Sequence, residues 1–171
     1  MELCEAIRKR RSIRAFEDRK VPQECIDSML EAAVHAPSEG NVQPWQFFVV
    51  TNERVKRRLA EAALNQMFVA KAPVVIVVCI NLNATAPYGR RGRELFSIQS
   101  TAAAVENMLL SAVSLNLGTC WVGSFKEGDV SAVLNLGSAV RPVALIPVGY
   151  PAESPQKRRR KPVKDVAFYV E

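Results

Sequence analysis

The stretch APSEGNVQPWQFFVV, residues 36–50, leads from a polar turn directly into an apolar strand. The turn, Pro37–Asn41, consists of residues that favour tight turns, and Pro44 follows it. Residues 46–51 show no alternation of apolar and polar side chains, which is typical of a strand covered on both faces. Residues 73–80 also lack this alternation and predict a second buried strand. The two runs predict a layered domain in which helices pack on a buried sheet.

Helical spacing and end signals predict helices at residues 2–10, 22–35, 53–63, 95–117 and 126–134. Further strands are predicted at residues 119–123, 143–148 and 166–170. We expect residues 81–93 to be an exposed excursion before the long helix. The last strand follows a long arm, so it must pair either at the edge of its own sheet or on a partner subunit. The broad apolar face of the long helix is consistent with burial against a second copy of the chain or within one subunit.

The composition limits the classes of protein to which this chain can belong. With 171 residues, 49% hydrophobic and 23% charged, the chain predicts a single folded domain over residues 1–171. No apolar run is long enough to span a bilayer, and the N-terminus does not resemble a signal peptide, so we expect a cytoplasmic protein with no membrane partner. Four scattered cysteines and one histidine exclude the usual zinc spacings, and a hydrolase would depend on His35 alone.

The net charge of +6 is concentrated near the two chain ends. Seven of the 23 cationic residues lie within residues 8–20, and five form the run Lys157–Lys161. These runs are consistent with separate solvated faces, with a nucleic-acid stripe, or with two halves of one anion site. Charge counting leaves the three interpretations open.

Two further motifs could carry chemistry. Arg10–Arg14 follows the first helix, and guanidinium groups suit a phosphate dianion, although basic residues also commonly decorate helix ends. Gly118–Gly123 has a glycine at each end, which allows close backbone approach. The chain contains neither a Walker phosphate loop nor a Gly-x-Gly-x-x-Gly motif. A bound nucleotide would therefore rely on arginines to hold its phosphate.

These motifs, in this order and spacing, resemble the FMN-dependent nitroreductase family. The resemblance covers nearly the whole chain, through residues 6–16, 36–45, 65–73 and 104–125 and through the basic tail with its final strand. It implies an α+β fold, a three-layer α/β/α sandwich with a mostly antiparallel sheet. It also implies a homodimer that exchanges its C-terminal strands and holds FMN at the interface, with NADH or NADPH as electron donor.

The resemblance also implies site residues. It places Arg10, Ser12, Arg158 and Arg160 at the FMN phosphate, Arg14 near the N1–O2 edge of the flavin, and Arg11 between these groups. Asn65 or Gln66 would bind the pyrimidine or ribityl side, and the backbone of Val122, Gly123 and Ser124 would meet the flavin near N5. From the other subunit, the turn would pack along the ring through Pro37, Ser38, Glu39 and Asn41. No metal is implied, and no side chain is assigned as a catalytic acid or base.

Three positions depart from the pattern of the family. Phe68 stands where many relatives have a lysine, Glu39 replaces a small residue, and Ser100 stands where short members often have an aspartate. The expected reaction is hydride transfer from NAD(P)H to a small oxidised acceptor, such as a nitroaromatic or a quinone, by a ping-pong mechanism. Alternatives are a flavin-binding redox sensor without turnover, an ene-reductase, dehalogenase or flavin-fragmenting variant, and a nucleic-acid-binding module. The three arginines of residues 81–93 either favour an anionic substrate or are simply solvated.

Overall fold

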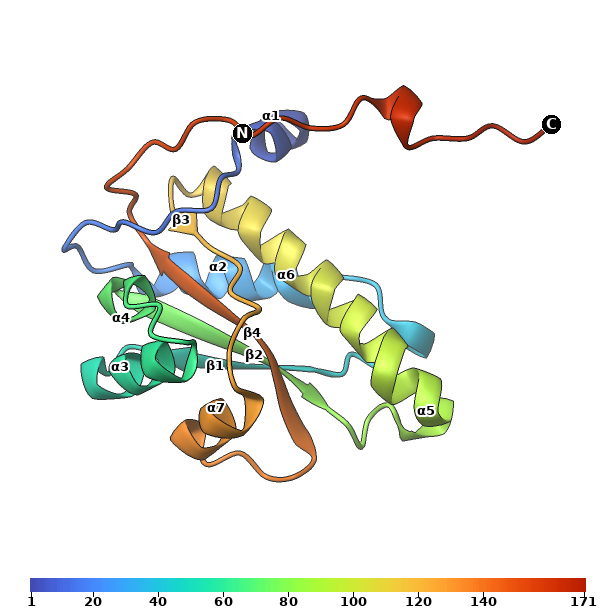
Figure 1. Cartoon of the computed structure of the whole chain (residues 1–171), viewed down its shortest axis with the longest axis horizontal. Helices are drawn as coiled ribbons and strands as arrows, with labels where there is room; N and C mark the ends of the chain where they lie inside the picture. The colour runs from blue at the N-terminus through green and yellow to red at the C-terminus, as the bar shows by residue number, and fades with distance from the viewer.

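A four-stranded antiparallel sheet lies at the centre of the protein, in the order β1-β2-β4-β3 (Figure 1). The computed structural model describes residues 1–171. The strands are β1 (Trp45–Val50), β2 (Val74–Asn81), β3 (Gly118–Thr119) and β4 (Val140–Gly149). In the register of the sheet, Val50 is opposite Val75 and Val74 is opposite Val148. The resemblance implied a mostly antiparallel sheet, and this expectation is confirmed.

Helices cover both faces of the sheet. Along β2, Val74, Ile76 and Val78 face one core, and Val75, Val77 and Cys79 face the other. The first core lies under α2 (Gln23–Val34) and α6 (Ser97–Ser114). The second lies under α3 (Glu53–Ala62), α4 (Phe68–Lys71) and α7 (Glu127–Leu134). The unbroken apolar run of β2 therefore predicted its two-sided burial correctly, and the three-layer sandwich is confirmed.

The excursion before the long helix is mostly exposed, as expected, but it is helical. It contains the 3₁₀ turn η2 (Ala86–Tyr88), the short helix α5 (Gly89–Arg91) and the π-helical turn η3 (Gly92–Phe96), which continues into α6. A Cβ atom at Gly92 would lie 2.5 Å from the Thr85 carbonyl oxygen, so this packing requires glycine. The predicted helix over residues 95–117 thus begins with a π turn, a feature that is common at functional sites.

Two predicted strands differ from the structure. The strand expected at residues 119–123 is reduced to β3 and an isolated bridge between Val122 and Leu145. The strand expected at residues 166–170 does not form within the single chain, because that segment has no strand beside it to supply hydrogen bonds. After the 3₁₀ turn η4 (Val163–Asp165) the chain continues as an extended arm.

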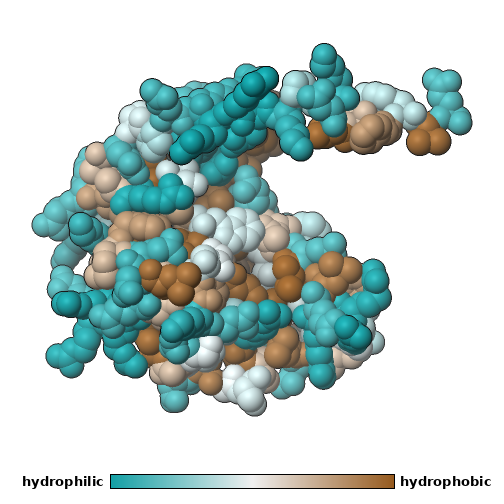
Figure 2. Space-filling model, viewed as in Figure 1, coloured by the Kyte–Doolittle hydropathy of each residue, from teal (hydrophilic) through white to brown (hydrophobic).

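The arm projects from the body of the molecule and carries apolar residues into solvent (Figure 2). Phe168, Tyr169 and Val170 are 86%, 90% and 96% exposed. The opposite end of the chain begins with α1 (Leu3–Lys9), which packs on α6. No helix combines the length and apolar character that a membrane crossing demands.

Candidate functional site

The two basic runs of the sequence meet in one cavity. It has a volume of about 420 Å³ and is lined by residues of the N-terminal segment and the C-terminal tail: Arg10, Arg11, Ser12, Arg14, Glu153, Pro155, Gln156, Arg158 and Arg160. Five guanidinium groups thus face a single carboxylate. Three interpretations of the charge pattern were open. This geometry agrees with the one in which the two basic runs form two halves of one anion site. A small dianion such as a phosphate matches the donor set.

Backbone contacts hold the N-terminal half of this arginine cavity in place. The Ile13 N–H donates to the Thr119 carbonyl oxygen over 2.9 Å, which attaches the segment to β3. A Cβ atom at Gly118 would lie 2.8 Å from Ile13 Cγ1, so glycine is required for this close approach. The prediction that a glycine beside β3 permits close packing is confirmed, although the neighbour is Ile13.

Glu153 ties the tail to the same segment. Its Oε1 atom accepts hydrogen bonds from the backbone N–H groups of Arg14 and Ala15, at 2.5 and 3.1 Å. The Ala152 N–H donates to the Ala15 carbonyl oxygen at 2.9 Å. Sequence reasoning missed Glu153, because a single acid in a basic tail has no distinguishing pattern. Its contacts place the segment that carries Arg158 and Arg160 opposite Arg10.

The arginines of the cavity have different fixed neighbours. Arg11 Nη1 donates to the carbonyl oxygens of Arg8 and Arg10, each at 2.7 Å, and so caps the end of α1. Arg10 Nε lies 3.8 Å from Glu106 Oε1 on α6. The Arg14 guanidinium lies 5.7 Å from the centroid of the Phe68 ring. Phe68 therefore offers Arg14 a cation–π contact at this side of the cavity.

A second group of predicted residues adjoins Phe68. Gln66 Nε2 donates to the carbonyl oxygens of Ala63 and Ser124, at 2.9 and 3.0 Å, which joins residues 65–66 to residues 122–124. Asn65 is exposed and has a left-handed backbone, with a φ of 60°. Gly123 and Ser124 are exposed, and the space beside the Gly123 Cα atom is open. These groups offer hydrogen bonds to the edge of a ring bound next to Arg14.

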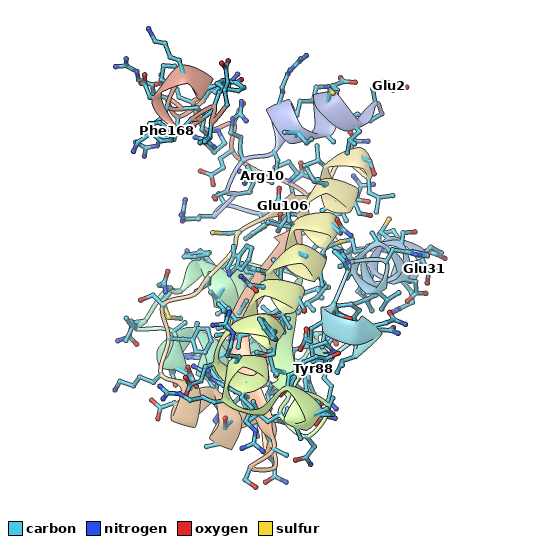
Figure 3. The ribbon with its side chains drawn as sticks, turned by 90° about the vertical axis from the view of Figure 1, so that its right-hand side faces the viewer. Glu2, Arg10, Glu31, Tyr88, Glu106 and Phe168 are labelled. Atoms are coloured by element: carbon cyan, nitrogen blue, oxygen red, sulfur yellow. The ribbon has the colours of Figure 1, made fainter.

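Pro37, Ser38 and Glu39 of the turn line a different cavity, of about 270 Å³, at the start of α6, and Asn41 lines neither cavity. Figure 3 shows the separation: Arg10 and Glu106 lie together near one end of α6, and Tyr88 lies near the other. The structure therefore brings together the predicted phosphate residues but not Pro37, Ser38, Glu39 and Asn41. Within one chain, the turn therefore does not contribute to the arginine cavity.

Two of the departures from the family pattern contact each other. Ser100 Oγ and Glu39 Oε2 are 2.5 Å apart, so the acid on the turn accepts a hydrogen bond from the hydroxyl on α6. The other carboxylate oxygen, Glu39 Oε1, is buried and has no hydrogen-bond partner. Beside it, a Cβ atom at Gly40 would lie 1.9 Å from Tyr88 Oη.

Thiol and metal chemistry do not fit the site. Burial raises the pKa of Cys79 to about 12. Burial also raises the pKa of Cys120, although Arg14 and Ser12 oppose the rise. No group of three metal-ligating side chains is present. The residues do fit FMN: the guanidinium groups match its phosphate, and the Arg14, Gln66 and Gly123 region matches the polar edge of a flat ring.

Comparisons with known proteins identify relatives of this chain. A model of the Nitroreductase family matches residues 7–72 and 65–150. A Methanothermobacter thermautotrophicus protein, provisionally named NADH dehydrogenase/NAD(P)H nitroreductase, is 38% identical over 92% of this chain and 82% of its own length. FMN reductase (NADPH) of Bacillus subtilis is 31% identical, over 95% of this chain and 71% of its own.

Solved structures show the same fold. The NfrA1 nitroreductase of Bacillus subtilis superposes with a TM-score of 0.90 at 28% identity, covering 98% of this chain and 73% of that one. Its likeness extends over nearly all the elements described above. On the family match and the relatives above 30% identity, the chain belongs to the nitroreductase family.

Proposed function

We propose that this chain forms one FMN-binding domain that passes hydride from NADH or NADPH to a small oxidised acceptor. The single observation that carries the proposal is the convergence of Arg10, Arg14, Arg158 and Arg160 on one cavity. When bound, FMN supplies a ring that can take up hydride from one molecule and give it to another. Homologues named as FMN reductases and NAD(P)H nitroreductases support the same chemistry.

Each group of the site then has a role. Arg10, Ser12, Arg158 and Arg160 hold the phosphate, with Arg11 fixed beside them at the end of α1. Arg14, stacked on Phe68, sets a positive charge next to the ring edge where reduction builds negative charge. Asn65, the Gln66 side-chain oxygen and the backbone of Gly123 and Ser124 would orient the ring through hydrogen bonds. Val122 does not contribute one, because its N–H and C=O both bond to Leu145. The chain supplies alignment and charge, so no side chain needs to donate or remove a proton.

A homodimer completes the proposed site. The turn Pro37–Asn41 lies away from the arginine cavity of its own chain and would cover the flavin of its partner. The exposed arm, residues 163–170, would exchange with the partner and bury its apolar side chains there. Donor and acceptor would occupy the same place over the ring in turn, which gives ping-pong kinetics.

Turnover distinguishes this proposal from a redox-sensing flavoprotein. The full-length protein is incubated with FMN, passed through gel filtration and assayed for NADH and NADPH oxidation with menadione and a nitroaromatic. We expect a yellow dimer and acceptor-dependent oxidation with parallel double-reciprocal lines. A colourless protein would overturn the cofactor assignment, and a yellow protein without turnover would favour the sensor. Tight, steeply salt-dependent binding to DNA or RNA would favour the nucleic-acid module.

A further inference from the structure

The cavity beside the turn contains one charged residue. Its lining consists of Pro37, Ser38, Glu39, Phe96, Gln99, Ser100 and Ala103. The arginines of the excursion do not line it. Arg90 pairs with Glu94 at 2.7 Å, and the Arg91 guanidinium lies 5.2 Å from the centroid of the Phe96 ring. The excursion therefore does not make this cavity cationic, and its charge comes from Glu39.

The Glu39 carboxylate is poorly screened. Its Oε2 atom accepts a hydrogen bond from Ser100 at 2.5 Å, the distance of a charge-assisted bond between a hydroxyl and a carboxylate. Its Oε1 atom is buried without a partner, and none of the salt bridges of the chain includes Glu39. A carboxylate with one buried oxygen and no ion-pair partner in its own chain acts strongly on a ligand in the adjoining cavity.

Packing fixes the position of this charge. Gly40 has a φ of 49° and backs directly onto the Tyr88 hydroxyl, so the turn follows the excursion closely. The Tyr88 ring in turn meets the Phe96 ring edge to face, with centroids 6.1 Å apart. Tyr88 and Ser100 thus hold the turn from two sides. Ser100 acts as the positioning residue for the Glu39 carboxylate.

We infer that Glu39 determines the charge specificity of the acceptor pocket. The carboxylate disfavours anionic acceptors such as carboxylates and sulfonates, and it admits neutral or cationic ones. This inference rests on the proposed function, because it takes the turn to lie against the flavin of the partner. Of the two interpretations of the arginines in the excursion, it favours the one in which they are solvated.

A pair of redox-inert ligands tests the inference by binding alone. Benzoate and benzamide have nearly the same shape and differ in charge. Each is titrated into the FMN-loaded dimer, and binding is followed by flavin absorbance and calorimetry. We expect benzamide to bind at least about tenfold more tightly than benzoate to the wild type, as repulsion at contact distance predicts. In Glu39→Gln we expect the ratio to fall below about threefold.

Matched variants separate the effect of the Glu39 charge on ligand binding from a general disturbance of the fold. Arg91→Gln removes a nearby charge that does not line the cavity, and the ratio should stay within about twofold of the wild type. Ser100→Ala keeps the Glu39 carboxylate but removes the hydroxyl that holds it in place. The benzamide-to-benzoate affinity ratio of this variant should therefore fall between the ratios of the wild type and of Glu39→Gln. As a second readout, kcat/KM for 4-nitrobenzamide relative to 4-nitrobenzoate should follow the same order.

Equal affinities in the wild type would overturn the inference, as would an unchanged ratio in a Glu39→Gln variant that keeps its FMN and its Tm. Both results leave the proposed function intact, because the protein still binds FMN and oxidises NAD(P)H. Failure of the wild type to bind FMN would instead overturn the proposed function.

Discussion

Glu153 binds the backbone of Arg14, and this contact joins the two ends of the chain at the arginine cavity. One carboxylate oxygen accepts from two successive N–H groups, those of Arg14 and Ala15. An acid in a cavity of arginines would be unfavourable for anion binding if it faced the anion alone. Here its first effect is to fix the segment that carries Arg14 against the tail that carries Arg158.

Removing this contact should weaken FMN binding. In Glu153→Ala the two backbone donors lose their acceptor, and the tail is no longer held opposite Arg10. We expect the Kd for FMN, measured by quenching of flavin fluorescence, to rise about tenfold, since a hydrogen bond to a charged group contributes about 1.5–3 kcal/mol. Glu153→Gln keeps an oxygen acceptor and should stay within about threefold of the wild type. Equal losses in both variants would contradict a tethering role.

Arg14 should set the redox potential of the bound flavin. Arg14→Gln removes the cation that stacks on Phe68, so reduced FMN loses a stabilising charge and the two-electron midpoint potential should fall by about 30 mV, equivalent to about 1.4 kcal/mol. Spectroelectrochemical titration measures the change. Arg19→Gln is a matched control, because Arg19 stacks on Tyr150 outside the arginine cavity. A potential that moves equally in both variants would contradict the assignment.

Gly118 should be intolerant of a side chain. The Cβ atom of Gly118→Ala would press on Ile13, and overpacking of this kind costs about 1–3 kcal/mol. We expect Tm to fall by about 2–4 °C for each kcal/mol. Gly128→Ala provides the control, since Gly128 lies in α7 with open space at its Cβ position, and its Tm should stay unchanged or rise. Thermal unfolding followed by circular dichroism compares the two variants.

Lys56 should make stability depend on alkaline pH. Its Nζ atom donates to the carbonyl oxygens of Ala72 and Pro73, at 2.6 and 3.2 Å, and burial lowers its pKa from 10.5. Between the lowered pKa and 10.5 the unfolded chain binds more protons, so the free energy of unfolding rises with pH in that window. Compared with Lys56→Met, the wild type should gain stability as the pH rises towards 10.5 and lose that gain as it falls. Lys71→Met, at an exposed lysine, should show no such trend in urea unfolding curves.

The arm should be needed for assembly. Deletion of residues 163–171 removes the most exposed apolar side chains, Phe168, Tyr169 and Val170. We expect the shortened chain to elute as a monomer or a dissociating dimer in gel filtration and to bind FMN at least about tenfold more weakly, since the proposed site takes its turn from the partner. Replacing Lys164 with serine leaves these apolar residues in place and should preserve the dimer. A truncated chain that remains a dimer with full FMN affinity would exclude strand exchange.

The sequence predicted those parts of the fold that local chemistry controls. The apolar runs of β1 and β2 required burial on both faces, and the helices around them follow from spacing and end signals. Prediction was poorer where pairing depends on distant segments. Residues 120–123 have strand-like composition, but only Gly118–Thr119 pairs continuously with β4. Residues 166–170 have the composition of a strand and no neighbour in the chain.

The same limit on prediction from sequence applies to the candidate site. The sequence showed the two basic runs, but their convergence on one anion site was only one of three open interpretations. Glu153 and the pairing of Glu39 with Ser100 could not be predicted, since each depends on a side chain whose partner is distant in sequence, 139 and 61 residues away. The order of helical turns in residues 86–96 depends on the close packing of Gly92 on Thr85, which has no local signature.

The separation of the turn from the arginine cavity along α6 has a consequence for cofactor retention. In the proposed dimer, one side of the flavin site comes from a second molecule, so affinity for FMN is tied by mass action to the concentration of the chain. Dilution would release subunits and cofactor together, and added FMN would drive subunits back into dimers. The amount of active enzyme would then grow faster than the amount of protein made, which gives the cell a threshold in expression below which the flavin is not captured.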